Sequence, residues 1–187
     1  MPAIPALVEP LSDGHVSLRL AGERDIPEVL IAHQEDPRLA AALGLDRPPS
    51  GAQLGRAMEE EAARREIGAG VTLTILAPGS DDCRGQIEAD SFDWEHAHAN
   101  LGIWIAPDVR GQGLGRRALA LAAAWLTGAG GLVRVQLMAP ADNEAAIRAA
   151  LGAGFTREGV LRAHARARGG RVDLTALSWI AIDSAPR

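Results

Sequence analysis

The sequence predicts one mixed α/β domain, and three observations support this fold class. First, 47% of the 187 residues are hydrophobic, which is enough to form a core. Second, segments that alternate apolar and polar residues are interleaved with segments of helical periodicity. Third, a glycine-rich turn connects a central strand to a long helix. We expect residues 1–14 to be a flexible N-terminal arm and residues 15–182 to be a single domain.

The order of elements follows from the hydrophobic period of each segment. Alternation predicts strands over residues 15–20, 71–77, 85–92, 99–106, 132–138, 154–161 and 172–182. Apolar spacings of three and four predict helices over residues 24–35, 52–67, 113–127 and 142–151. The polar segment DWEHAH suits a hairpin loop, so the strands before and after it are expected to be antiparallel.

Composition narrows the functional class. The net charge of −5 disfavours a general nucleic-acid binder, although every one of the 19 basic residues is Arg. No apolar run is long enough to span a bilayer, and the N-terminus lacks the pattern of a signal peptide. The single cysteine, Cys83, excludes an internal disulfide. We therefore expect a cytoplasmic protein that binds neither membrane nor nucleic acid.

The glycine-rich turn, Arg110-Gly111-Gln112-Gly113-Leu114-Gly115, raises the main functional question. The first N–H groups of a helix have no partner within the helix, and the helix dipole adds positive charge there. Glycine allows an anion such as pyrophosphate to approach this backbone closely. The turn matches neither the P-loop, since the chain has no Lys, nor the G-x-G-x-x-G dinucleotide fingerprint. A glycine-rich turn without a ligand is the alternative.

The same six residues resemble the R/Q-x-x-G-x-G/A signature of the GNAT superfamily, the acetyl-CoA-dependent N-acetyltransferases. The preceding LGIWIAP, the ADNEAAIRAALGAGF segment with Asn143, and Gly154-Phe155 are also similar to that superfamily. FTREGVLR and RVDLTALSWI resemble its RimJ/RimL-type branch. The resemblance covers about residues 15–182. It implies a twisted, mostly antiparallel sheet with splayed central parallel strands and about four flanking helices.

The resemblance also implies how acetyl-CoA binds. The pyrophosphate would be held by the backbone of Gln112, Gly113, Gly115 and Arg116, with Arg110 and Gly111 shaping the turn. The pantetheine arm would pair with the backbone of Ile103 and Ile105 and contact Asn143. Capping the following helix is an equally good role for Asn143, and one residue can do both.

The implied chemistry is direct attack of a primary amine on the thioester, and the amine must first lose a proton. Glu88 and Asp90 lie two residues apart on a strand and so share one face, which makes them the candidate catalytic bases, Glu88 before Asp90. A base consisting of water, with the two carboxylates merely solvated, is the alternative. The leaving-group acid is absent from its usual places, where Ala146 replaces Ser and Ala150 replaces Tyr.

The remaining clusters have ordinary explanations. His96 and His98 form a weak ligand set, so no metal is expected. The arginines near the C-terminus suit an exposed hairpin, and binding of an acidic acceptor or of the adenosine phosphate is the alternative. They are Arg157, Arg162, Arg166, Arg168 and Arg171.

The sequence thus predicts an N-acetyltransferase acting on a peptide N-terminus or a small amine. The alternative is a degenerate acyl-CoA-binding sensor or interaction module. Dimers are common in the family, so a homodimer stays open.

Overall fold

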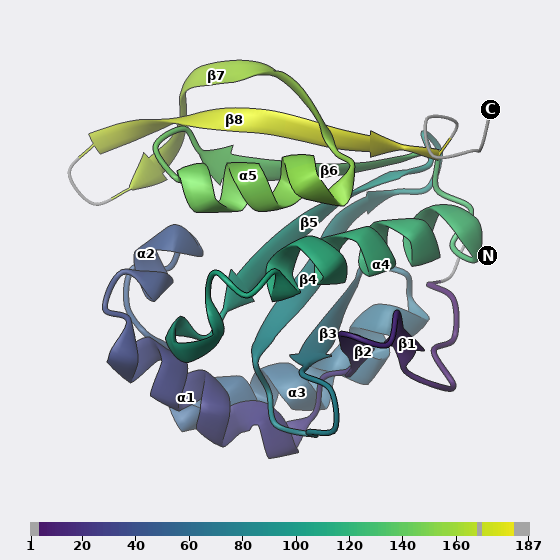
Figure 1. The fold of residues 1–187 in the computed structure, drawn as a ribbon, viewed down its shortest axis with the longest axis vertical. Helices are drawn as coiled ribbons and strands as arrows, with labels where there is room; N and C mark the ends of the chain where they lie inside the picture. The colour runs from purple at the N-terminus through teal and green to yellow at the C-terminus, as the bar shows by residue number, and fades with distance from the viewer. Residues whose placement is uncertain (1–3, 168–169, 182–187) are drawn as a thin grey trace.

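A twisted sheet organises the fold, and the computed structural model describes residues 4–167 and 170–181 of it (Figure 1). Within those residues the sheet has eight strands in the order β1-β2-β3-β4-β5-β6-β8-β7. The strands are β1 Leu11–Ser12, β2 Ser17–Leu20, β3 Gly70–Leu76, β4 Gly85–Asp93, β5 His98–Ile105, β6 Arg134–Pro140, β7 Thr156–Ala167 and β8 Gly170–Ile180. All neighbouring pairs are antiparallel except β5 and β6, which are parallel.

Helices cover both faces of this sheet. They are α1 Ile26–Glu35, α2 Leu39–Ala42, α3 Gly51–Glu66, α4 Leu114–Gly128 and α5 Glu144–Ala153, with short 3-10 turns at Glu23–Asp25 and Pro107–Val109. The larger core lies under α4 and α5, where Leu119 and Ile147 pack with Ile87 and Leu137. A smaller core under α1 to α3 surrounds Trp104. The mixed α/β prediction is therefore confirmed.

The parallel pair in the middle of the sheet separates after a short ladder. Residues 98–101 of β5 pair with residues 134–137 of β6, and the pairing ends at Leu101 and Leu137. Strand β5 nevertheless continues to Ile105 and β6 to Pro140. The two strands thus splay at their carboxyl ends, as the resemblance implies.

Three elements differ from the sequence-based expectation. Strand β1 is absent from the prediction, since its two residues lie in the segment expected to be an arm. Helix α2 is absent from the prediction because its four residues are too few to show a period. Strand β7 continues beyond the predicted end at Leu161 to Ala167, since pairing with β8 resumes after an irregularity between Leu161 and Ala165. The predicted end of the last strand, residue 182, lies outside the described residues.

The N-terminal segment contributes to the core. Ile4 is 6% exposed and belongs to the cluster under α4 and α5, while Leu7 and Leu11 pack against that cluster. That residues 1–14 are a flexible arm stays a prediction, and residues 1–3 lie outside the described part of the chain.

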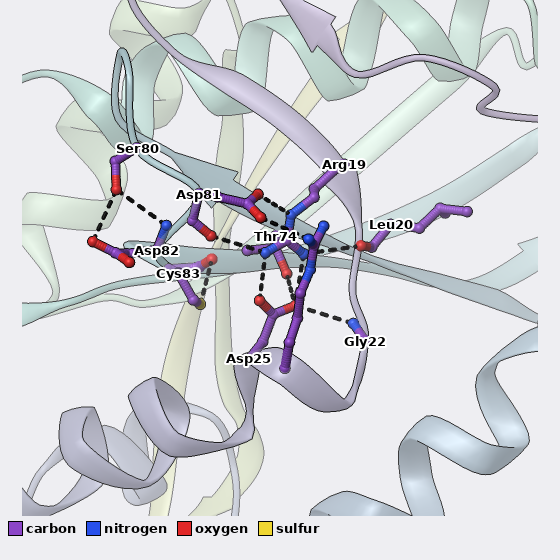
Figure 2. Close-up of polar contacts among 11 residues, drawn as sticks. Arg19, Leu20, Gly22, Asp25, Thr74, Ser80, Asp81, Asp82 and Cys83 are labelled. Atoms are coloured by element: carbon purple, nitrogen blue, oxygen red, sulfur yellow. Dashed lines mark hydrogen bonds and ion pairs between the residues drawn. The ribbon is translucent and has the colours of Figure 1, made fainter.

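A buried ion pair fixes the start of α1 to the sheet (Figure 2). Arg19 of β2 donates from Nη1 and Nη2 to the carboxylate of Asp25, at 2.9 and 2.6 Å, and from Nε to Asp81 at 2.9 Å. Asp25 also accepts from Thr74 Oγ1 at 2.7 Å and from the Gly22 N–H at 3.0 Å. Burial alone would raise the pKa of Asp25, but the hydrogen bonds from Arg19 and Thr74 lower it overall. The charge is stable here because nearby donors surround it.

Candidate active site

The splayed strands expose backbone groups at the centre of the sheet. The Ala106 N–H donates to Arg84 O at 2.9 Å, and the Trp104 carbonyl also faces β4, since a Cβ added to Gly85 would clash with it. Backbone direction alternates along a strand, so the N–H and C=O groups of Ile103 and Ile105 point away from β4. The β6 ladder has already ended at Leu101, so these two residues face the split. The geometry fits the predicted backbone partners of a pantetheine arm at Ile103 and at the Ile105 N–H, whereas the Ile105 carbonyl already accepts from Arg110.

The glycine-rich turn leaves open space at the start of α4. Gly111 and Gly113 adopt positive φ angles of 77° and 84°, which L-residues with side chains rarely adopt. A Cβ added to either would meet no heavy atom within 4 Å. Gly113 is the N-cap residue of α4, so the unpaired N–H groups of the first helical turn lie beside this open space. The turn therefore has the backbone geometry and the room of an anion cradle.

Gly115 has a different reason to be glycine. A Cβ at this position would lie 3.4 Å from Ile105 Cγ1. The first turn of α4 therefore packs close to β5, which brings the cradle to the mouth of the split.

The side chain of Arg110 is directed to protein groups. Its Nε donates to the Ile105 carbonyl at 2.9 Å, and its Nη2 lies 2.7 Å from the Asp36 carboxylate just after α1. Burial opposes ionisation of Asp36, but the hydrogen bonds from Arg110 and from the Arg38 N–H lower its pKa overall. Arg110 thus ties the turn to the end of β5 and of α1, and its part in a cofactor-binding turn stays a prediction.

The next two arginines behave differently from each other. Arg117 pairs with Asp13 at 2.8 Å, so its charge is compensated within the protein. Arg116 is exposed, and its stem passes over Gly152, where an added Cβ would lie 2.8 Å from Arg116 Cδ. Gln112 is exposed and makes a long contact, 3.4 Å, from Nε2 to Asp108 O. Arg116 and Gln112 are therefore exposed side chains that no strong contact in the turn holds, whereas Arg110, also exposed, is held by Ile105 and Asp36.

Asn143 caps α5. Its Oδ1 accepts from the Ala146 N–H at 3.1 Å, which establishes the capping role. Asn143 also lines the cavity described below, and capping uses only the carbonyl oxygen. Its amide group can still donate to a ligand, so the predicted contact with the pantetheine arm stays a prediction.

Glu88 and Asp90 share one face of β4, as predicted. Ile87 and Ala89 are buried on the opposite face at 0% and 1% exposure. Glu88 lies opposite Gly102 of β5, directly after the last residue paired with β6, and Asp90 lies opposite Asn100. A Cβ on Gly102 would meet nothing within 4 Å. Glu88 is thus the carboxylate closer to the opening of the split, and free space lies in front of it.

A second charge accompanies Glu88. Arg64 of α3 places Nη2 3.0 Å from Glu88 Oε1 and Nη1 3.4 Å from Glu61 Oε2. Glu61 is 4% exposed and holds the backbone of β3 through the Thr72 N–H at 2.5 Å. The position of Glu88 is consequently fixed from α3, whereas Asp90 has no ion pair among the described residues.

A cavity of about 590 Å³ connects the split to the two carboxylates. Its wall combines Glu88 and Asp90 of β4, residues 101–104 of β5, residues 137–140 of β6, the start of α5 and one side of α1 to α3. Both strands of the split line it, so a molecule lying in the split would reach the carboxylates.

The expected absence of a leaving-group acid has a structural counterpart. Ala146 lines the cavity, but its methyl group has no proton to donate, and Ala150 is completely buried. Neither position can therefore protonate a thiolate.

Other singled-out residues lie away from the cavity wall. His96 and His98 approach Asp93, at 2.9 and 3.5 Å, and no group of three or more potential metal ligands occurs in residues 4–167 and 170–181. Burial raises the pKa of the Cys83 thiol to about 12.

No helix in residues 4–167 and 170–181 is long and apolar enough to cross a membrane.

The arginines of the β7–β8 hairpin are exposed, as predicted. Arg166 lies opposite Arg171 across the two strands, and Arg171 donates to the Ala163 carbonyl at 3.0 Å. Arg157 and Arg162 are exposed as well, while Arg168 lies outside the described residues. A role for them in binding an acceptor or the adenosine phosphate stays a hypothesis.

Sequence reasoning missed His33 of α1, which lines the cavity and is 6% exposed. It also missed Arg64, which holds Glu88. A polar residue one helical turn after a buried Val29 is a weak signal in a sequence, because a solvated side chain gives the same pattern.

The fold and the cavity fit an acyltransferase, and a family model supports this class. A family model described as an acetyltransferase (GNAT) domain matches residues 15–156. The chain belongs to this GNAT acetyltransferase family. Acetyl-CoA is the co-substrate of the family, and the open glycine turn beside the split fits it. No curated protein sequence matches the chain.

Solved structures with similar folds include three acetyltransferases. Mycobacterium smegmatis RimJ in complex with CoA-disulfide is 20% identical with a TM-score of 0.83, over 95% of this chain and 88% of that chain. The ribosomal-protein-S5-alanine acetyltransferase from Vibrio fischeri is 16% identical with a TM-score of 0.80, over 95% and 100%. A Salmonella typhimurium acetyltransferase that modifies the N-terminal serine of ribosomal protein L7/L12 is 19% identical with a TM-score of 0.79, over 92% and 99%.

Proposed function

We propose that this protein transfers the acetyl group of acetyl-CoA to a primary amine, at a protein or peptide N-terminus or on a small molecule. The observation that carries this proposal is the continuity of the site. The open turn at Gly111 and Gly113 lies next to the split, since Gly115 packs against Ile105, and both strands of the split line one cavity together with the two carboxylates. Family membership supports acetyl transfer, and the acceptor is the part proposed here.

Acetyl-CoA supplies the acyl group as an activated thioester. In this proposal the backbone at Gln112, Gly113, Gly115 and Arg116 binds its pyrophosphate, with Arg110 and Gly111 holding the turn. Ile103 and Ile105 orient the pantetheine arm from the split, and Asn143 donates to it from the start of α5. The acetyl group then lies near Gly102, where the split opens.

Glu88 and Asp90 are the proposed proton acceptors for the incoming ammonium group, either directly or through a water molecule. Glu88 is preferred because it faces the space beside Gly102, and Arg64 holds it in place. The neutral amine attacks the thioester carbonyl, and the thiolate leaves. Its proton comes from water, because Ala146 and Ala150 offer none.

Peptides that begin with small residues form the first acceptor panel. The structural neighbours include an enzyme that modifies an N-terminal serine and one described as an alanine acetyltransferase. Serine, threonine, alanine and glycine peptides, together with a small polyamine, would therefore be mixed with acetyl-CoA while free thiol is measured. Thiol release that depends on one acceptor supports the proposal, and tight CoA binding without release for any acceptor contradicts it.

The carboxylates are tested with isosteric variants. Glu88→Gln is expected to lower kcat by about 10²-fold or more, the usual range for a lost general base, and Asp90→Asn less. The affinity for CoA should not change, because neither residue lies at the cradle. A larger loss in Asp90→Asn would reverse the assignment, and full activity in both would leave water as the only base.

The alternative is a degenerate module that binds acyl-CoA without transfer, and Ala146 and Ala150 favour it. Ala146→Ser separates the two functions because the new hydroxyl would face the cavity. A protein that is already an enzyme would turn over at least as fast. A degenerate module would show activity only in the variant.

A further inference from the structure

The space at the opening of the split is larger than an acetyl group requires. Gly102 lies opposite Glu88, directly after the last β5 residue paired with β6. It lines the cavity of about 590 Å³, and an added Cβ would meet no heavy atom within 4 Å. An acetyl group has only one methyl group beyond the thioester carbonyl. Because protein interiors are closely packed, unfilled space at this point is room for a larger ligand group.

The cavity wall on the β6 and α5 side is mainly apolar. Residues 137–140 of β6, which read LMAP, line it together with Ile103 of β5. Ala146, in the first turn of α5, adds a single methyl group. The polar residue on this side is Asn143, whose Oδ1 already accepts from the Ala146 N–H. A hydrocarbon chain could therefore be buried here without displacing water from a charged group.

The acyl chain and the amine would use different parts of this cavity. Glu88 and Asp90 mark the place of the amine on β4, and α1 to α3 supply the neighbouring wall. Gly102 lies opposite Glu88, so the reacting carbonyl would lie in front of it. Met138 and Ala146 line the side formed by β6 and α5. A chain that extends from the carbonyl toward them stays clear of both carboxylates.

We propose that this side of the cavity is an acyl-chain pocket, and that the protein accepts unbranched propionyl and butyryl groups from CoA thioesters as well as acetyl. This inference rests on the proposed function, because it names the donor class of the same site. The transfer step is unchanged. The amine nitrogen bonds to the acyl carbon, the C–S bond breaks with its electron pair on sulfur, and the ammonium proton goes to Glu88 or water. Burial of each added CH₂ group strengthens binding about fourfold.

Calorimetry without an acceptor measures the pocket separately from turnover. We expect the Kd to fall from acetyl-CoA through propionyl-CoA to butyryl-CoA, by about tenfold over the two added CH₂ groups. Ala146→Leu fills the pocket from α5, where leucine suits a helix. It should reduce the ratio of the acetyl-CoA and butyryl-CoA Kd values to less than about twofold, chiefly by weakening butyryl-CoA. Equal Kd values for the three thioesters in the unmodified protein would overturn the inference.

Two controls separate the pocket from general effects on the fold. Ala145→Leu makes the same change at the preceding residue of α5, which is exposed and does not line the cavity, so the tenfold ratio should remain. If Ala146→Leu fails to fold, Gly102→Val fills the space from β5, and Gly159→Val on β7 is its control, since an added Cβ meets no heavy atom within 4 Å at either glycine. A filled variant that weakens free CoA as much as butyryl-CoA, or that keeps the ratio, overturns the inference.

Failure of the inference and failure of the proposed function look different. Mass spectrometry of an acceptor incubated with each thioester shows which acyl group it receives, and we expect all three. An acetylated acceptor with no propionylated or butyrylated product overturns the donor class and leaves the N-acetyltransferase in place. Tighter binding of butyryl-CoA without acylation of any acceptor overturns the proposed transfer, and only the acyl-chain pocket then stands.

Discussion

The two ends of α1 are held by two Arg–Asp pairs that differ in environment. At the start of the helix, Arg19 and Asp25 are 9% and 3% exposed in their side chains. At its end, Arg110 and Asp36 are 45% and 17% exposed. The first pair joins α1 to β2 and β3 within the core, and the second joins it to the glycine turn of the candidate active site.

The difference shows how similar chemistry can serve stability in one place and function in another. A buried charge without its partner is very costly, so the Arg19–Asp25 pair must persist in the folded protein. A more exposed pair contributes little stability but still fixes geometry. Helix α1 carries His33, which lines the cavity, between these two ends. The two pairs together therefore fix the position of this helical wall of the cavity relative to the glycine turn.

The largest expected effect is on stability, at the buried pair. Asp25→Ala would leave Arg19 and Thr74 without their main acceptor and should lower the free energy of unfolding by about 3–5 kcal/mol. Asp81→Ala is the matched control, because Asp81 also binds Arg19 but is 61% exposed; it should cost no more than about 1 kcal/mol. Urea unfolding measures both, and a larger loss in the control would refute the distinction.

A second effect is expected on activity, at the exposed pair. Arg110→Met removes the contacts to the Ile105 carbonyl and Asp36, so the turn and the α1 wall lose their alignment. We expect a loss in kcat/KM on the order of tenfold, the scale of one modest interaction, with the melting temperature almost unchanged. Asp36→Asn should lose less, since the contact to Ile105 remains. A large drop in melting temperature without a change in kinetics would mean that this pair is structural too.

A smaller effect is expected at acidic pH, at a third Arg–carboxylate pair. The hydrogen bond from Arg134, then that from Ser178, lowers the pKa of Glu158 from 4.5 to about 2. A carboxyl group whose pKa is lower in the folded than in the unfolded protein stabilises the fold at pH values above its unfolded pKa. For Glu158 this contribution to the free energy of unfolding is lost as the pH falls from 4.5 to about 2. Glu158 is 41% exposed, so screening reduces the contribution to about 1 kcal/mol. Glu158→Gln should flatten the loss of stability between these pH values, and an unchanged pH profile would contradict the assignment.

Local sequence patterns predicted most of the fold and the backbone of the site. Hydrophobic periods identified every long strand and helix, and the glycines marked the turn before α4, because these signals lie within a few residues. The shared face of Glu88 and Asp90 followed from the period of a strand. Packing between distant segments could not be predicted in the same way. Arg110 reaches Asp36, and Arg64 reaches Glu88, only because the sheet brings α1 and α3 over its centre.

His33 illustrates the limit most clearly. Its spacing from Val29 suits a helix face, but the sequence cannot show that the face closes a cavity or that Nδ1 lacks a partner. The missing signal is the arrangement of α1 relative to β5, which depends on the ion pairs at both of its ends.

CoA binding to two matched glycine variants tests most directly whether the turn before α4 binds the pyrophosphate. Gly113 and Gly79 have similar positive φ angles, 84° and 71°, and an added Cβ would meet no heavy atom within 4 Å at either. Gly113→Ala and Gly79→Ala should therefore cost similar stability, but only Gly113 lies at the cradle. Calorimetry is expected to show at least a tenfold increase in the Kd for CoA, about 1.4 kcal/mol, for Gly113→Ala and no change for Gly79→Ala. Equal affinity in both variants would contradict the claim that the turn before α4 binds the pyrophosphate.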